Sequence, residues 1–339
     1  MPVDLSTLED LPPELRQALK AAKPLETLSL AQLGTLGHDE RQLVEGGILP
    51  EKGCLVIGAP YKTGKSWLVA QAAVELATGK PFWGTYRVPN PLKILLFDAE
   101  NGPSLVHERL DRVANYYGGV NGNLMVVCQT GARLDDPGGQ ARFMVTVQAF
   151  GPQVIVLDPL YRYHSADENS EQQMHPVLAF LSEIAELFGT ALIVVHHANK
   201  AQYNGKPAPM SPDRLRGSTV IPGWATSILM LKGDPMDGVE VLPTLRRGPP
   251  ENFKLTLNEE LGVFLPKDGA LDGALVSYVR DVGGSIPMPD AKKWVAEVRD
   301  ITEKQAGRLI EGVVQRGALL HERLNGRTGL LRLRDEPPT

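Results

Sequence analysis

Residues 54–66 read Cys-Leu-Val-Ile-Gly-Ala-Pro-Tyr-Lys-Thr-Gly-Lys-Ser, and this stretch decides the fold of the chain. The apolar run at 55–57 predicts a buried strand, and the helix-forming stretch that begins at Trp67 ends near Gly79. A strand, a loop of small residues, Gly-Lys-Ser and a helix make the pattern of a phosphate-binding P-loop. Backbone N–H groups of such a loop and the helix N-terminus surround the β-phosphate of a nucleotide. The sequence therefore predicts a nucleoside triphosphate site.

Within this loop, we expect Lys65 to reach the β- and γ-phosphates and the Ser66 hydroxyl to bind Mg²⁺. The pattern has Gly six residues before the lysine, but here Ala59 is in that place and Gly58 comes one residue earlier. Ala can replace Gly there if its φ is negative, and Pro60 stiffens the loop. The residues expected to contact the nucleotide are Ala59, Pro60, Lys62, Thr63, Gly64, Lys65, Ser66 and Trp67.

Beyond the loop, apolar runs alternate with amphipathic stretches. Strands are predicted at 93–98, 124–128, 153–158 and 191–195, and helices at 104–117, 138–150 and 173–188. This alternation predicts an α/β core with a largely parallel sheet, right-handed crossovers and helices on its faces. Ligands of such sheets bind at the carboxyl ends of the strands.

Acidic residues follow two of these predicted strands. Asp158 ends an apolar run and is expected to hold Mg²⁺ through water, and a buried acid without a metal is the alternative. Pro159 follows it, so the residue that activates water is not an adjacent Glu. Glu100 is the candidate base that orients water opposite the γ-phosphate, and Asp98 is the competing choice.

Five motifs follow one another in the chain: Gly64-Lys65-Ser66, Asp98-Ala99-Glu100, Leu157-Asp158-Pro159-Leu160, His196-His197-Ala198-Asn199-Lys200 and Arg216-Gly217-Ser218. Their order resembles the RecA/DnaB-type ATPases and, more narrowly, the RepA-type hexameric replicative helicases of plasmids, phages and mobile elements. The resemblance covers residues 40–265. It implies a RecA-like core that uses ATP and Mg²⁺, assembled as a ring, usually a hexamer, with the nucleotide between neighbouring subunits.

The resemblance also assigns expected roles to single residues. Lys65 and Ser66 match the phosphate and Mg²⁺ residues, Glu100 the catalytic glutamate, and Asp158 the Walker B aspartate. His197 matches a γ-phosphate sensor. Further along, Arg216 matches an arginine finger offered to the neighbouring subunit, with Arg246 and Arg247 as competing fingers. Arg109 matches an arginine near the nucleotide.

Polar segments at 161–173 and 199–215 follow two of the catalytic strands. In a RecA-type ring, such segments line the central channel and grip single-stranded DNA. Ordinary surface loops are an equally open interpretation. The candidate phosphate contacts are Lys200, Lys206 and Arg214, and the candidates for base stacking are Tyr161, Tyr163 and Tyr203.

A second unit is expected after a linker at 266–270. Residues 271–334 show helical patterns at 271–282, 292–299 and 303–315, then a hairpin of 319–324 and 330–333 around Asn325-Gly326. This resembles a winged helix-turn-helix domain, with Lys304 and Arg308 on an exposed helix face and Arg327 on the wing. This is the only region with a net positive charge, and it is expected to bind duplex DNA or a protein partner.

Composition sets the remaining expectations. The 339-residue chain has a net charge of −5 and two cysteines, Cys54 and Cys128, which lack metal-ligand spacing. No signal peptide or membrane-spanning run is evident, so a cytoplasmic protein is expected, with residues 1–39 as an N-terminal extension that has a helix at 14–22. The leading hypothesis is an ATP-driven helicase or translocase on single-stranded DNA. The alternatives are a regulatory or recombination-accessory ATPase, and a DNA-binding initiator controlled by ATP.

Overall fold

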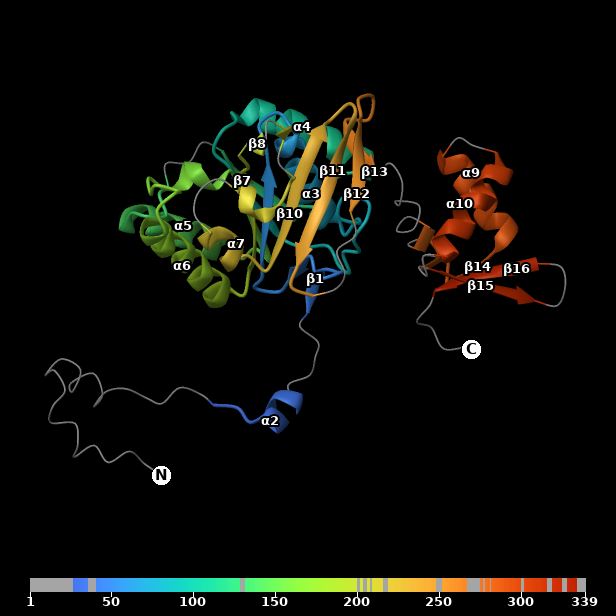
Figure 1. Cartoon of the computed structure of the whole chain (residues 1–339), viewed down its shortest axis with the longest axis horizontal. Helices are drawn as coiled ribbons and strands as arrows, with labels where there is room; N and C mark the ends of the chain where they lie inside the picture. The colour runs from blue at the N-terminus through green and yellow to red at the C-terminus, as the bar shows by residue number, and fades with distance from the viewer. Residues whose placement is uncertain are drawn as a thin grey trace, which may run out of the picture. The chain divides into compact units, whose positions relative to one another are not determined.

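The computed structural model divides into two units, Met1–Glu40 and Arg41–Thr339, and each is described by itself (Figure 1). The described residues are 27–35, 41–128, 132–199, 202–203, 206–207, 209–215, 219–247, 252–266, 275–276, 278–280, 282–299, 302–315, 319–324 and 328–333. In the first unit, the described part contains one short helix, α2 (Leu30–Thr35). The helix expected at 14–22 lies outside the described residues.

A nine-stranded sheet in the order β13-β12-β11-β10-β3-β7-β6-β4-β5 forms the centre of the second unit, as far as the described residues go. From β10 to β5, neighbouring strands are parallel, whereas β10 to β13 pair antiparallel. The bounds are β3 (Cys54–Ala59), β4 (Ile94–Asp98), β5 (Leu124–Cys128), β6 (Val154–Asp158), β7 (Ala191–His197), β10 (Ser227–Asp234), β11 (Gly238–Leu245), β12 (Phe253–Asn258) and β13 (Val263–Pro266). The predicted largely parallel α/β sheet is confirmed.

Helices cover both faces of this sheet. The bounds are α3 (Lys65–Thr78), α4 (Pro103–Tyr117), α5 (Pro137–Phe150), α6 (Glu171–Phe188) and α7 (Val220–Trp224), with short 3₁₀ turns η2 (Leu160–Tyr163) and η3 (Pro212–Arg214). One core packs α3 against strand residues such as Leu96 and Val156. The other packs α5 and α6 against their neighbours Phe97 and Leu157. Successive strand residues face opposite sides, so uninterrupted apolar runs are needed, and each buried side chain stabilises the fold by roughly 1.5–3 kcal/mol.

The antiparallel extension β11–β13 was not predicted from the sequence. Its strands are only partly buried, with burial that alternates irregularly in β11 and is mostly intermediate in β12. The segment expected as a loop at 199–215 also contains a small ladder, β8 (Gln202–Tyr203) with β9 (Lys206–Pro207). Before the P-loop, β1 (Gln42–Val44) pairs with β2 (Leu49–Pro50).

The C-terminal elements have their own apolar cluster, which includes Val279, Val295, Ile310 and Leu331. They are β14 (Ser285–Pro287), α9 (Met288–Arg299), α10 (Glu303–Gln315), β15 (Leu319–Leu324) and β16 (Thr328–Leu333), with sheet order β14-β16-β15. The bounds expected for α10 and β15 agree with the structure. Helix α9 begins four residues earlier than expected, because Pro289 is tolerated in a first helical turn. Only parts of the helix expected at 271–282 lie within the described residues.

A buried carboxyl group ties α3 to its surroundings. Glu75 accepts hydrogen bonds from the Trp83 backbone N–H (2.6 Å), from Gln71 Nε2 (2.8 Å) and from the Tyr117 hydroxyl (2.8 Å). Gln71 in turn exchanges two hydrogen bonds with the backbone of Phe264 in β13. Burial raises the pKa of Glu75 to about 8, although the three donors act in the opposite direction. The network therefore holds a carboxyl group that is largely protonated at neutral pH.

The Glu75 network predicts that the protein loses stability as pH rises. The folded state binds the Glu75 proton more tightly than the unfolded state, so this stabilisation is complete below about pH 4.5 and is lost as pH rises through about 8. Thermal denaturation should show a Tm that falls between pH 6 and pH 9. Glu75→Gln, which carries no charge at any pH, should flatten that fall by several degrees.

The matched control is Glu259→Gln, which changes an exposed side chain in the turn between β12 and β13. Its Tm should follow the wild-type pH dependence. Parallel curves for Glu75→Gln and wild type would contradict the protonated carboxyl group.

Candidate nucleotide-binding site

The P-loop joins β3 to α3 and has the backbone that its sequence demands. Ala59 is the last residue of β3, where it pairs with His197, so this position uses extended backbone and tolerates a side chain. Left-handed backbone occurs instead at Lys62 (φ 66°) and Gly64 (φ 83°). A Cβ on Gly64 would lie 3.0 Å from both Phe264 and Pro235. Glycine is therefore required at 64 and not at 59, which explains the departure from the strict pattern.

The first turn of α3 offers groups that suit a phosphate. Gly64, its N-cap, supplies no side-chain hydrogen bond, so N–H groups of the first turn remain available to an anion. Lys65 Nζ donates to the carbonyl oxygens of Pro60 (2.8 Å) and Ala59 (3.3 Å). Burial lowers the Lys65 pKa, and the nearby carboxylates of Asp158 and Glu100 act against that shift. Ser66, the expected Mg²⁺ ligand, is partly buried in the same turn.

Two buried aspartates end neighbouring strands of the sheet. Asp98 of β4 and Asp158 of β6 occupy matched positions in the parallel ladder and are only 5% and 4% exposed. Burial raises the Asp158 pKa to about 7, and the negative charges of Asp98 and Glu100 add to the shift. Lys65 and Arg109 act in the opposite direction. This edge of the sheet is therefore a place where an added positive charge, such as a metal ion, is stabilised.

Asp98 shapes the turn that presents Glu100. Its Oδ1 accepts hydrogen bonds from the backbone N–H groups of Glu100 (3.1 Å) and Asn101 (2.8 Å), and the Asn101 side-chain amide donates to it at 3.0 Å. Glu100 itself is exposed, and its Oε1 accepts a hydrogen bond from the Tyr161 hydroxyl. The Asp98 carboxylate is occupied by the turn, whereas the Glu100 carboxylate stands at the surface of the site.

Arg109, on α4, is the most direct sign of a missing anion. Its Nε and Nη1 atoms are buried and have no hydrogen-bond partner among the described residues. It also lies close enough to Asp158 to lower that residue's pKa. A buried guanidinium without acceptors is costly, and a phosphate would supply the oxygens it needs. The donor set of this site therefore fits a nucleotide.

Strand β7 contributes His197, which contacts Tyr161 with ring centroids 5.3 Å apart. The Arg162 guanidinium also lies over the Tyr161 ring, 5.3 Å from its centroid. Glu100, Tyr161 and His197 are thus brought together from the end of β4, from η2 and from β7. The contact between Tyr161 and Glu100 was not foreseen, because no spacing in the sequence relates residues 61 positions apart.

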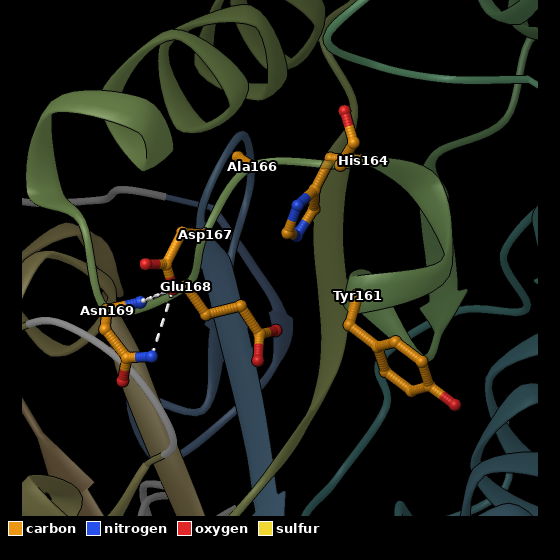
Figure 2. A pocket seen from close by; sticks show the side chains of 7 residues that line it. Tyr161, His164, Ala166, Asp167, Glu168 and Asn169 are labelled. Carbon is orange, nitrogen blue, oxygen red and sulfur yellow. Dashed lines mark hydrogen bonds between the residues drawn. The ribbon is translucent and has the colours of Figure 1, made fainter.

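The preceding histidine, His196, belongs to a second group of side chains. Its Nδ1 lies 3.6 Å from Glu168 Oε1, and Glu168 lines a pocket of about 350 Å³. This pocket is lined by Tyr161, His164, Ser165, Ala166, Asp167, Glu168 and Asn169 (Figure 2). His164 is 8% exposed, neither ring nitrogen has a hydrogen-bond partner among the described residues, and burial lowers its pKa. The pocket therefore combines a neutral imidazole with carboxylates.

The expected DNA-contacting residues have mixed outcomes. The stacking role expected of Tyr163 is wrong, because its ring is fully buried and packs edge-on against Phe97. Arg214 Nε donates to the Asn199 carbonyl (3.0 Å), where it closes the base of the 199–215 segment. On α10, Lys304 is exposed and Arg308 is helical. Lys200, Arg216 and Arg327 lie outside the described residues, and so do the side chains of Tyr203 and Lys206.

The strand order, the P-loop and the two-sided helix layers are those of a RecA/DnaB-like P-loop ATPase. The solved ATPase domain of a DnaB-like helicase has the same fold, with a TM-score of 0.50 and 15% sequence identity, over 70% of this chain and 95% of that one. In the part of the chain that the structure describes, no helix is long and apolar enough to cross a membrane.

The AAA_25 family, described as an AAA domain, matches residues 20–203, which is more than half of the chain. The chain belongs to this family. It is also similar to the DNA repair protein RadA of Synechocystis, with 22% identity over 270 residues. That alignment covers 73% of this chain and 46% of RadA, so the chain spans about half the length of this relative.

Proposed function

We propose that this protein binds ATP with Mg²⁺ at the P-loop and hydrolyses it. The observation that carries the proposal is Arg109, whose buried nitrogens lack acceptors among the described residues, beside a P-loop lysine and two strand-end carboxylates. Lys65 and Arg109 would neutralise the phosphates, and Ser66 and Asp158 would hold the metal ion. Mg²⁺ keeps most of its waters and needs only one or two protein ligands when phosphates supply the rest.

Glu100 is the residue we propose as the general base. It would orient a water molecule and accept its proton as the water oxygen attacks the γ-phosphorus and ADP leaves. Asp98 is the weaker candidate, because three hydrogen bonds already engage its carboxylate in the turn. His197 would sense the γ-phosphate, since its ring reaches Glu100 through Tyr161.

We further propose that hydrolysis drives movement along single-stranded DNA, as in the RepA-type ring helicases that the motif order resembles. The name of the relative RadA, a DNA repair protein, supports a role in DNA metabolism. Lys200, Lys206 and Arg214 would be the phosphate contacts. The alternatives remain a regulatory or recombination-accessory ATPase and an ATP-controlled initiator, neither of which would unwind DNA.

The base assignment predicts a separation of binding from turnover. Glu100→Gln should bind a fluorescent ATP analogue normally and lose about 10²–10⁴-fold in kcat, because a neutral amide cannot accept the proton. Measurements of phosphate release with and without single-stranded DNA, alongside unwinding of a forked duplex, test both the chemistry and the motor. Glu183→Gln, which changes an exposed residue on α6, is the control and should be unaffected.

Two outcomes would count against these proposals. Normal turnover in Glu100→Gln with loss in Asp98→Asn would transfer the base to Asp98. ATP hydrolysis that responds to DNA without any unwinding or translocation would favour the regulatory alternative.

The proposed ring requires a residue that acts on a neighbouring subunit, and Arg216 is our candidate. Mixtures of Lys65→Ala and Arg216→Ala subunits should recover part of the ATPase activity that each lacks alone. The reason is that an interface between the two variants keeps one intact lysine and one intact arginine. Activity should also rise with protein concentration as subunits assemble, which light scattering can follow in parallel. Concentration-independent activity that survives Arg216→Ala would contradict both the finger and the ring.

For the C-terminal elements, we propose a winged-helix domain that contacts duplex DNA through α10. The apolar residues Ile310 and Val313 are buried in its cluster, and Lys304 on the same helix is exposed. Arg308 and Arg327 are the other candidate contacts. A protein-docking role for this domain is the alternative.

A double variant, Lys304→Ala with Arg308→Ala, tests the duplex contact in the full chain. If both residues touch phosphates, the slope of log affinity against log salt should fall by about two, and basal ATP hydrolysis should not change. Titration of labelled duplex at several salt concentrations gives the slope. The control is Lys293→Ala on α9, which removes one exposed positive charge elsewhere in the domain. An unchanged slope would favour protein docking.

A further inference from the structure

The turn at the end of β6 carries a side chain that reaches the proposed base. Tyr161, in η2, donates a hydrogen bond through its hydroxyl to Glu100 Oε1. We propose that Tyr161 is the positioning residue for Glu100: it occupies one carboxylate oxygen and thereby directs the other towards the attacking water. This proposal rests on the proposed role of Glu100 as general base.

The protonation state of Tyr161 suits this role. Burial and the hydrogen bond to Glu100 both raise the Tyr161 pKa above its usual value, so the hydroxyl keeps its proton at neutral pH. Tyr161 is therefore a hydrogen-bond donor throughout the neutral range. It does not compete with Glu100 for the proton of water.

The position of Tyr161 is fixed by its neighbours. Leu160 and Tyr163, in the same 3₁₀ turn, are fully buried in the core that contains Phe97 and Leu157. This anchors the backbone on either side of Tyr161. The ring is also contacted by the Arg162 guanidinium and the His197 ring, each 5.3 Å from its centroid. A hydrogen bond from a side chain held in this way fixes the orientation of its acceptor.

The arrangement has a chemical consequence for Glu100. A donor hydrogen bond to a carboxylate stabilises its ionised form, so the bond from Tyr161 keeps the Glu100 carboxylate unprotonated to lower pH. During turnover, the proton of the attacking water would pass to the other oxygen of Glu100, and the tyrosine proton would stay in place. The hydroxyl thus contributes both orientation and the range of pH in which the base is active.

Tyr161→Phe tests the proposal, because it removes the hydroxyl and keeps the ring. We expect kcat for ATP hydrolysis to fall about 10- to 100-fold with KM for ATP within about twofold of wild type. The acid limb of the kcat profile should move to higher pH, since Glu100 loses a donor. The matched control is Tyr163→Phe, which removes a buried hydroxyl that has no hydrogen-bond partner among the described residues and should leave both readouts unchanged.

Tyr161→Phe with the kcat and acid limb of Tyr163→Phe would overturn the proposal. So would a lower kcat with an unmoved acid limb, because general loosening of the loop gives that result. Glu100→Asp is the second variant: it shortens the carboxylate away from an intact Tyr161, and should give the same fall in kcat and the same shift. Glu100→Gln, measured alongside, separates the two ideas. Full turnover in Glu100→Gln refutes the base itself, whereas its inactivity with a neutral Tyr161→Phe refutes only the positioning role.

Discussion

The burial of the parallel sheet on both faces is the constraint on which the rest of the structure depends. Strands β3, β4 and β6 are buried at every residue, so each face of each strand must be apolar. Polar chemistry can then enter only where a strand ends and meets water. Because parallel strands all end at the same edge, the P-loop, Asp98, Asp158 and the β7 histidines converge there without any dedicated scaffold. The cost is mutual repulsion between the acids, visible in the raised Asp158 pKa, which Lys65 and Arg109 partly relieve.

This constraint also explains how much could be predicted from the sequence. Uninterrupted apolar runs that end in acid marked β4 and β6, and placed Asp98, Glu100 and Asp158 at one edge. The strands β11–β13 gave no such signal, because they are half-buried and pair antiparallel. The error at Tyr163 has a local cause: within the 3₁₀ turn, Tyr161 faces Glu100 while Tyr163 enters the core. Sequence spacing cannot separate these two tyrosines, because only the packing of η2 does.

The end of β7 joins the two groups of polar side chains through adjacent residues. Successive side chains of a strand point to opposite faces, so His197 contacts Tyr161 while His196 pairs with Glu168 at the pocket. The segment Tyr161–Asn169 is thereby held at both of its ends by neighbouring residues of one strand. Movement of this strand end would be felt at Glu100, through Tyr161, and at the pocket, through Glu168. A nucleotide sensor and a loop that responds to it need no longer connection than this.

The charges of this segment limit how it would hold a nucleic acid. Between positions 161 and 173 it carries one arginine, Arg162, against Asp167, Glu168 and Glu171. Arg162 already lies over the Tyr161 ring, and Glu171 accepts a hydrogen bond from Thr219. Phosphates would be repelled by the remaining acids, so any contact of this segment with a strand must use base edges or stacking instead of backbone charge. The positive charge that neutralises phosphates has to come from the 199–215 segment, where Lys200 and Lys206 lie. The two segments that follow β6 and β7 are therefore unequal partners: one is built to report on Glu100, and the other carries the charge.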